Sequence, residues 1–172
     1  SDDFIGDTAM TYIQKFGVDT SAIVKSKRPL GVYFLEVGAV IRPSMISYNR
    51  SHSAFSEIEP SKVNWETALK NGEWMHWTGI TPALSKGAYD LLKDGLKLAR
   101  EKGMAVSADP TYRSGLWKYG QDPKEALIEL LNYSTIFIGG VNEINEVLGT
   151  NFGYDNEDFI KASKQLILEF PS

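Results

Sequence analysis

Residues 74–110 read WMHWTGITPALSKGAYDLLKDGLKLAREKGMAVSADP, and this stretch decides the fold class. Two short apolar runs, Trp74–Trp77 and Met104–Ala108, are typical of strands, and the first is expected to be buried. Between them, apolar residues recur at helical spacing from Leu84 to Ala99, and Gly103 ends the predicted helix. A strand, a helix and a second strand in this order indicate a parallel βαβ unit in an α/β fold.

The same alternation continues toward the carboxyl end. Helices are predicted over about Pro123–Leu131, Asn142–Leu148 and Glu157–Phe170. Thr135–Ile138 is predicted to be the next strand. The sheet is therefore expected to be parallel and covered by helices on both faces.

The first third of the chain is richer in strands. A helix is predicted over Thr8–Phe16, with its N-cap at Asp7 or Thr8, and a short strand over Ala22–Val24. Gly31–Val37 is aromatic and β-branched, and it is expected to pair with Met45–Asn49 in antiparallel fashion. We expect one domain over residues 1–172, with a lid over about 28–55 and an α/β body over about 1–27 and 56–172.

Composition excludes several classes of protein. The 172 residues are 42% hydrophobic and 23% charged, which is ordinary for a globular protein that buries a core. A net charge of −4 without a basic block argues against broad nucleic-acid binding. Without cysteine there is no disulfide or thiolate metal site. No apolar run approaches the ~20 residues of a membrane span, and no leader pattern opens the chain, so a cytoplasmic location without a membrane partner is expected.

Three loops follow the predicted parallel strands, at the edge of the sheet where such folds bind ligands. They are Thr78–Ile80, Asp109–Arg113 and the segment that begins at Gly139. The Arg113 guanidinium offers a fork of donors that suits a carboxylate or a phosphate. The alternative is an exposed arginine that pairs with Asp109, and the topology does not choose between the two.

A second candidate group lies on the predicted lid. Tyr48 and Arg50 are two residues apart and share one face if strand geometry persists, and Tyr33 on the partner strand would lie on that face too. Two phenols and a guanidinium suit a small polyhydroxylated anion. A cross-strand aromatic pair beside a solvated arginine explains the same spacing, and by spacing alone it is the simpler interpretation.

The segment after Thr135–Ile138 joins a glycine pair to a helix. Such a pair lets a phosphate approach a helix N-terminus, and the carboxylates nearby could hold magnesium through water. Acidic residues are also common in the first turn of any helix, which is the plainer explanation. The two histidines, His52 and His76, have no metal-ligand spacing, so no direct metal site is expected.

Segments along nearly the whole chain match a known family. They are Ser1–Gly6, Phe16–Thr20, the lid stretches Gly31–Glu36, Arg42-Pro43 and Tyr48–Ala54, and Asp109–Arg113 with Leu116-Trp117. On these segments the chain resembles the ribokinase-like (PfkB-type) carbohydrate kinases, and among them the 2-keto-3-deoxygluconate kinases. The resemblance implies a three-layer α/β/α parallel sheet with a small β lid.

The resemblance also implies roles for single residues. Tyr33, Tyr48 and Arg50 would contact the keto-acid sugar from the lid, Ile80 would contribute from a strand-end loop, and Arg113 would pair with the carboxylate. ATP and Mg²⁺ would be the cofactors, and the γ-phosphoryl group would pass to the terminal hydroxyl of the sugar. The lid strands are further expected to support a homo-oligomer.

The chain departs from the family pattern at two places. For the family's Asn-x-x-Glu motif, one alignment puts Gly140 and Glu143 at the Asn and Glu positions, and another puts Asn142 and Asn145 there. We prefer Glu143 as the residue near nucleotide and Mg²⁺. Thr111 replaces the usual Asn before the Tyr-Arg pair, which keeps a hydrogen-bonding group but loses the amide.

Kinases that this chain resembles are roughly twice as long. Their Gly-Ala-Gly-Asp anion hole and catalytic base have no counterpart here, so no catalytic residue is assigned, and an internal segment that is inactive alone is expected. Two alternatives remain: a kinase of a neutral sugar such as fructose or ribose, and a non-catalytic module that binds a sugar acid. Arg50 and Arg113 weigh against a neutral sugar, which would leave two cations without an anion.

Overall fold

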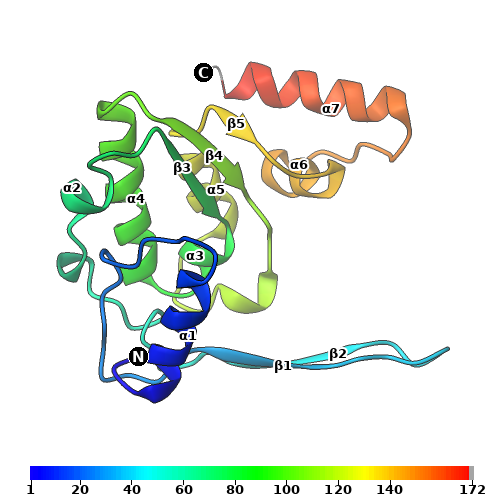
Figure 1. The fold of residues 1–172 in the computed structure, drawn as a ribbon. Coiled ribbons are helices and arrows are strands. Elements are labelled where there is room, and N and C mark those ends of the chain that lie inside the picture. The colour runs from blue at the N-terminus through cyan, green and yellow to red at the C-terminus, as the bar shows by residue number, and fades with distance from the viewer. Residues whose placement is uncertain (171–172) are drawn as a thin grey trace. The chain divides into compact units, whose positions relative to one another are not determined.

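The computed structural model describes residues 1–170, and the chain divides between Val63 and Asn64 into two compact units (Figure 1). The first unit contains α1 (Phe4–Gln14), β1 (Val32–Glu36), β2 (Met45–Asn49) and a 3-10 turn at Pro60–Lys62. The second contains α2 (Trp65–Ala68), β3 (Trp74–Thr78), α3 (Ile80–Ala83), α4 (Lys86–Glu101), β4 (Ala105–Asp109), a 3-10 turn at Ser114–Leu116, α5 (Pro123–Leu131), β5 (Ile136–Phe137), α6 (Val141–Leu148) and α7 (Asn156–Glu169). Residues 1–27, placed with the body from the sequence, cluster with the lid strands in the first unit.

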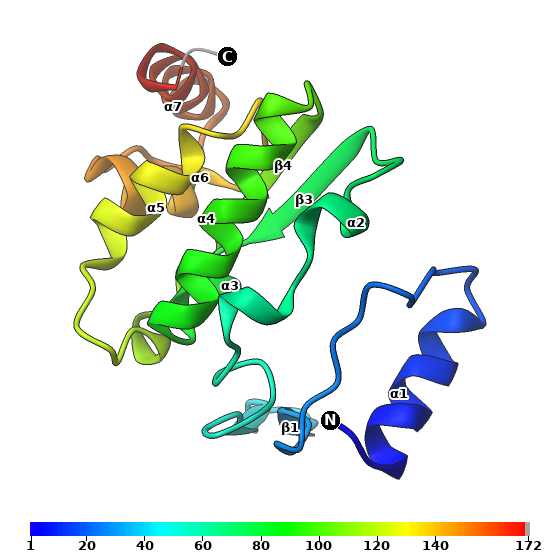
Figure 2. The same cartoon turned by 90° about the vertical axis from the view of Figure 1, so that its left-hand side faces the viewer.

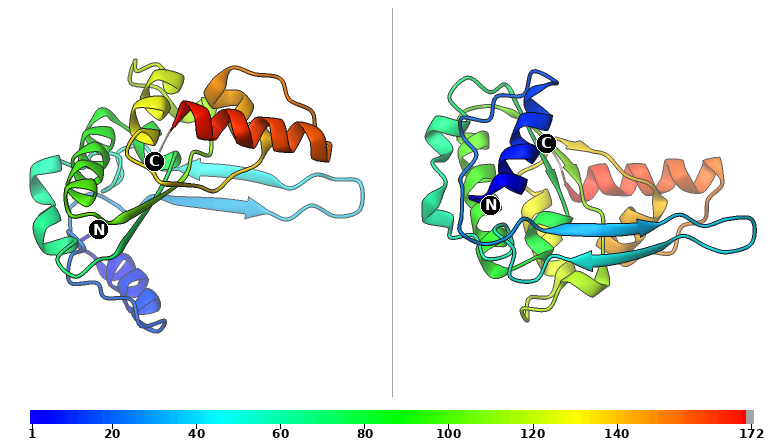
Figure 3. Two further views of the ribbon diagram at one scale, coloured as in Figure 1. Left: turned by 90° about the horizontal axis from the view of Figure 1, so that it is seen from above. Right: turned by 60° about the horizontal axis from the view of Figure 1, so that its bottom comes forward.

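The lid of the first unit is a two-stranded antiparallel hairpin. Strands β1 and β2 pair from Val32 opposite Asn49 to Glu36 opposite Met45, so the predicted pairing is confirmed. Figure 3 shows the two strands extending side by side. Every residue of the pair except Val32 is exposed, because a lone hairpin has no second layer against which to bury either face.

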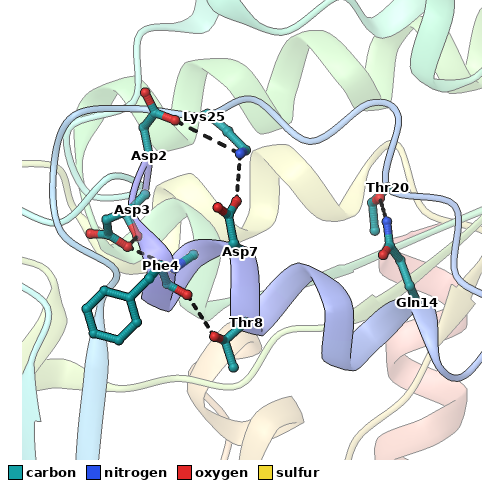
Figure 4. Close-up of polar contacts among 10 residues, drawn as sticks. Asp2, Asp3, Phe4, Asp7, Thr8, Gln14, Thr20 and Lys25 are labelled. Carbon is teal, nitrogen blue, oxygen red and sulfur yellow. Dashed lines mark hydrogen bonds and ion pairs between the residues drawn. The ribbon is translucent and has the colours of Figure 1, made fainter.

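Helix α1 begins four residues earlier than the sequence predicted. Its N-cap is Asp3, whose Oδ1 accepts a hydrogen bond from the Gly6 amide at 2.9 Å. Asp7, one of the two predicted caps, instead accepts a hydrogen bond from Lys25 Nζ at 2.7 Å (Figure 4). Asp3 therefore satisfies an amide at the start of the helix that neither Asp7 nor Thr8 reaches.

The predicted strand at Ala22–Val24 is wrong. These residues are irregular in the structure, and Ile23 and Val24 are 45% and 40% exposed. A strand needs a neighbour to receive its backbone hydrogen bonds, and within the described residues no strand lies beside this segment. Three apolar residues in a row do not supply that neighbour.

The second unit is built on a three-stranded parallel sheet in the order β3-β4-β5. Met75 lies opposite Val106 and Trp77 opposite Ala108, so these four side chains share one face. All four are buried in one core cluster with Leu92 and Leu96 of α4 and Leu127 and Leu130 of α5. Figure 2 shows α4 in front, with β4 behind it and β3 beside it.

The other face of β3 is more open than predicted. Trp74 is 57% exposed, so the prediction of a wholly buried strand is wrong; the strand alternates between the helix-covered face and this one. Trp74 Nε1 donates to Ser107 Oγ at 2.8 Å, and His76 Nδ1 lies 2.7 Å from the same oxygen. His76 thus has a hydrogen-bonded position in the sheet.

The remaining helices follow the predictions closely. Helix α5 has the predicted bounds, and α4, α6 and α7 differ from them by one or two residues. Ala162 and Leu166 of α7 pack on Ile144 of α6 in a second, smaller cluster. The short helix α3 was not predicted. None of the helices within residues 1–170 has the length and apolarity that a membrane crossing requires.

Candidate functional site

The candidate residues fall into two groups, one in each unit. Tyr33, Tyr48 and Arg50 belong to the lid hairpin, and Ile80, Arg113 and Glu143 belong to the second unit.

On the lid, Tyr33 and Tyr48 lie directly opposite each other in the register of β1 and β2. Their ring centroids are 6.2 Å apart and the ring planes are tilted by 50°. The guanidinium carbon of Arg50 lies 4.9 Å from the Tyr48 ring centroid and 5.7 Å from that of Tyr33. The structure thus brings the three residues together on one face, where the planar guanidinium is held by two π systems.

The turn after β2 fixes the backbone from which the Arg50 side chain extends. The Ser53 amide donates to the Arg50 carbonyl at 3.3 Å, and the Ala54 amide donates to the Pro29 carbonyl at 2.8 Å. Gly31 gives room for the arginine stem, because a Cβ there would lie 3.6 Å from Arg50 Cγ and 3.2 Å from Ser53 Cβ. The position of the guanidinium therefore depends on backbone contacts on both sides of the hairpin.

In the second unit, the loops after β3 and β4 start at the same edge of the sheet. Thr78 pairs with Asp109 in register, and the Gly79 amide donates to the Asp109 carbonyl at 2.7 Å. A Cβ at Gly79 would lie 2.7 Å from the Thr111 carbonyl oxygen and 2.8 Å from the Pro110 carbonyl carbon. Only a residue without a Cβ lets the two loops pack this closely.

The loop after β4 begins with a side-chain turn. Asp109 Oδ1 accepts hydrogen bonds from the Thr111 amide at 3.1 Å and from the Thr111 hydroxyl. Thr111 is therefore engaged with the strand end. This turn directs the chain toward Tyr112 and Arg113.

Arg113 is exposed, and its Nη1 donates to the Tyr112 carbonyl at 3.0 Å. Within the described residues no carboxylate forms an ion pair with it, so the alternative pairing with Asp109 is not found. Most of the guanidinium fork faces solvent and is available to an anion. Ile80, half-buried, is the first residue of α3 rather than part of an irregular loop.

Glu143 has a structural partner that the sequence did not show. Its Oε2 accepts a hydrogen bond from the Gly140 amide at 3.0 Å, which caps the start of α6. Because this carboxylate already occupies the amide, it competes with a phosphate at the helix N-terminus. The other carboxylate oxygen, Oε1, accepts no hydrogen bond within residues 1–170.

Asn145, the alternative at the Glu position of the motif, holds the loop after α6 together. Its Oδ1 accepts hydrogen bonds from Thr150 Oγ1 and from the Phe152 amide, both at 2.9 Å, and its Nδ2 donates to the Phe152 carbonyl at 3.0 Å. Asn142, the alternative Asn, is exposed and accepts a hydrogen bond from the Tyr154 hydroxyl. The Oδ1 of Asn145 has no capacity left for a ligand.

Metal binding is not supported by clustering in the described part of the chain. No group of three or more His, Cys, Asp or Glu side chains that could hold a metal ion occurs there. His52 is paired with Glu57, which also forms an ion pair with Arg28 Nε at 2.7 Å.

Comparisons with known proteins identify the family of the chain. The family described as pfkB family carbohydrate kinase matches residues 1–171, so the chain belongs to the PfkB carbohydrate kinase family. Members of this family are kinases, enzymes that transfer phosphoryl groups to carbohydrates. The fold of the chain is that of the ribokinase-like kinases.

Two relatives and one solved structure are informative. A 2-dehydro-3-deoxygalactonokinase of Haloferax volcanii is 26% identical over 84% of this chain and 45% of its own length. A 2-dehydro-3-deoxygluconokinase of Bacillus subtilis is 27% identical over 82% of this chain and 44% of its own. The crystal structure of a 2-dehydro-3-deoxygluconokinase from Thermotoga maritima is 38% identical, with a TM-score of 0.90 over 99% of this chain and 52% of its own. The chain therefore spans about half the length of these relatives.

More distant structures share the fold alone. A fructokinase from Xylella fastidiosa with bound ATP superposes with a TM-score of 0.79 at 19% identity, over 98% of this chain. The resemblance inferred from the motifs is thus confirmed at the level of the family. No comparison tests the individual site residues.

Proposed function

We propose that this chain forms the acid-recognition part of a kinase that phosphorylates 2-keto-3-deoxygluconate or its galactonate isomer. The observation that carries the proposal is a pair of guanidinium groups without a carboxylate partner within the described residues, Arg50 and Arg113. A neutral sugar offers neither of them an anion, whereas a sugar acid does. The names of the relatives above point to the same substrate class.

Each group has a part in this scheme. Arg113 pairs with the carboxylate, since its planar fork matches two carboxylate oxygens better than a lysine would. Tyr33, Tyr48 and Arg50 contact the hydroxyl-bearing part of the sugar from the lid, and Ile80 supplies an apolar contact. These residues bind and orient the acceptor, and none of them takes the proton from the reacting hydroxyl.

ATP is the proposed donor, and Mg²⁺ would offset the charge of its phosphates when bound. In the transfer, a bond forms between the terminal hydroxyl oxygen and the γ-phosphorus, the bond to ADP breaks, and the hydroxyl proton passes to a base that is not assigned in this chain. Carboxylate oxygens suit Mg²⁺, so Glu143 is proposed as a residue near the nucleotide-bound ion, through Oε1 and water. Its other oxygen remains the cap of α6.

The lid is also proposed to carry a homo-oligomer contact. Phe34 and Met45, which are 65% and 61% exposed, lie on the face of the hairpin opposite to Tyr33 and Tyr48. An interface on that face would cover apolar surface and leave the tyrosine–arginine face open to substrate.

The proposed function is tested by an ADP-release assay on the complete gene product. Ketodeoxygluconate, ketodeoxygalactonate, fructose and ribose are compared at equal concentrations. We expect a clear preference, in kcat/KM, for the sugar acids. A preference for fructose or ribose would overturn the proposal in favour of a neutral-sugar kinase, and binding of acids without ADP release would favour a non-catalytic module.

A further inference from the structure

Tyr119 connects two loops that are far apart in the sequence. Its hydroxyl donates a hydrogen bond to the Pro82 carbonyl oxygen at 2.6 Å, across 37 positions of the chain. Pro82 lies in α3, the turn that begins with Ile80, and Tyr119 lies at the end of the loop that carries Arg113. The bond therefore joins the loop after β3 to the loop after β4.

Both partners of this bond are well anchored. Pro82 is less than 2% exposed and Ala83 is fully buried, so α3 is fixed against the core. The Tyr119 ring stacks on Trp117, with centroids 6.0 Å apart and planes 28° apart, and both rings pack against the main core cluster. Burial raises the pKa of the Tyr119 hydroxyl to about 12, so the phenol keeps its proton and remains a donor at neutral pH.

The two loops have a second contact at their other end. Gly79 packs directly on the backbone of Pro110 and Thr111, as described above. Arg113 lies between this contact and Tyr119 in the sequence, with one hydrogen bond to the adjacent Tyr112 carbonyl. The direction of its guanidinium fork therefore depends on how the loop is held at both ends.

We propose that Tyr119 is a positioning residue for the sugar-acid site, because its hydroxyl holds the loop of Arg113 against the turn of Ile80. The inference rests on the proposed function, since it assigns the carboxylate contact to Arg113. A guanidinium displaced by even about 1 Å loses the two-point match to a carboxylate. Tyr119 acts through Arg113 and touches no reacting atom.

The test removes only the hydroxyl, with Tyr119→Phe in the complete gene product. Losing one partly buried hydrogen bond is expected to raise KM for ketodeoxygluconate roughly five- to tenfold. The carboxylate contact is remote from the reacting hydroxyl, so kcat is expected to stay within about twofold of the wild type. Tyr133→Phe is the matched control, because Tyr133 packs on the same core and its hydroxyl has no hydrogen bond within residues 1–170.

A double-mutant cycle separates positioning from general stability. If Tyr119 acts through Arg113, Tyr119→Phe is expected to change KM by less than about twofold in the Arg113→Ala background. Equal effects in both backgrounds, or a fall in kcat with KM unchanged, would overturn the inference. So would a Tyr133→Phe effect as large as that of Tyr119→Phe.

Hydrogen exchange gives a readout that does not need activity. In Tyr119→Phe, the amides of residues 80–84 and 111–117 are expected to exchange faster, while those of β4 are unchanged. If the wild type uses no sugar acid, the proposed function fails, and unchanged exchange in these two segments then overturns the positioning role independently.

Discussion

Arg113 lies four residues beyond the end of β4, in a loop whose shape is set by its neighbours rather than by its own contacts. The sequence left its role open between an anion contact and a surface pair with Asp109. In the structure the two side chains form no ion pair within the described residues, and Asp109 Oδ1 instead accepts hydrogen bonds from Thr111. Sequence spacing cannot decide such a question, since it does not show which of two nearby donors a carboxylate selects.

At this scale, Arg113→Ala in the complete gene product is expected to raise KM for ketodeoxygluconate roughly 10- to 100-fold, because a charge-assisted contact is lost. The KM of Arg113→Lys should lie between those of the wild type and Arg113→Ala, since the charge remains and the fork is lost. Steady-state kinetics with ADP release measure both. Arg100→Ala, an exposed arginine in the last turn of α4, is the control and should leave KM unchanged; an equal loss with neutral sugars would argue against a carboxylate contact.

Gly79→Ala tests the packing of the two strand-end loops. The added Cβ would meet the Thr111 carbonyl oxygen at 2.7 Å, and backbone atoms on that side move only if the loop after β4 shifts. The free energy of unfolding is expected to fall by about 1–3 kcal/mol, measured by urea denaturation of the 172-residue chain. Gly115→Ala is the control, because a Cβ added there would meet no atom within 4 Å. Equal stability of the two variants would contradict the close packing.

At the scale of elements, α4 and α5 are joined by a polar group at the edge of the core. Glu129 of α5 accepts hydrogen bonds from Lys93 Nζ and from the Tyr89 hydroxyl, both of α4. The hydrogen bond from Lys93, and then that from Tyr89, lower the pKa of the Glu129 carboxyl. The sequence predicted both helices but gave no sign of this bridge, because its partners are 36 and 40 positions apart.

Because the pKa of Glu129 is lowered in the fold, the bridge should contribute less to stability as the pH falls. The unfolded chain takes up a proton at Glu129 at a higher pH than the folded chain does. The bridge therefore stabilises the fold at pH values above the pKa of Glu129 in the unfolded chain, and this stabilisation is lost as the pH falls through the pKa of Glu129 in the folded chain. Urea midpoints measured from about pH 6 down to about pH 2 should fall less steeply for Glu129→Gln than for the wild type. The effect is modest, since the carboxylate is 44% exposed.

The control for this experiment is Glu101→Gln. Glu101 is exposed at the end of α4 and forms no ion pair within the described residues. Its replacement should leave the acid slope as in the wild type. The bridge would be rejected as a source of pH dependence if Glu129→Gln and the wild type lost stability in parallel.

The lid hairpin exposes apolar side chains on the face away from the tyrosines. Because Phe34 is 65% exposed on the face away from the tyrosines, Phe34→Glu is expected to dissociate a lid-mediated oligomer of the complete gene product. Sedimentation velocity measures the change. Phe4→Glu, which puts the same charge on exposed α1, is the control and should leave the oligomer intact. A monomeric wild type would contradict the proposed contact.

On the scale of the whole molecule, hydrophobic burial is very uneven. All of the buried hydrophobic residues lie at or beyond Leu69, and the described residues of the first unit bury only Gly6 and Ser53. The second unit therefore holds the core, and the first depends on hydrogen bonds and ion pairs at its surface. Surface pairs of this kind contribute little to stability.

This difference predicts unequal protection from hydrogen exchange in the 172-residue chain. Amides of β3, α4 and β4 should exchange slowest, near the rate set by global unfolding, and those of α1, β1 and β2 should exchange much faster. Exchange followed by mass spectrometry of peptides covers both units. Similar protection in the two units would show that the lid is stabilised by contacts other than those described.

The sequence by itself determined the order and type of nearly all elements and the family. Periodicity and turn residues are local, so α5 and β2 were predicted with their observed bounds, and the sugar-kinase motifs could be read along the chain. Only the tertiary structure decided the start of α1 at Asp3, the exposure of Trp74 and the capping role of Glu143. It alone placed Tyr119 on Pro82, because a hydrogen bond across 37 positions depends on how two βαβ loops meet at the edge of the sheet.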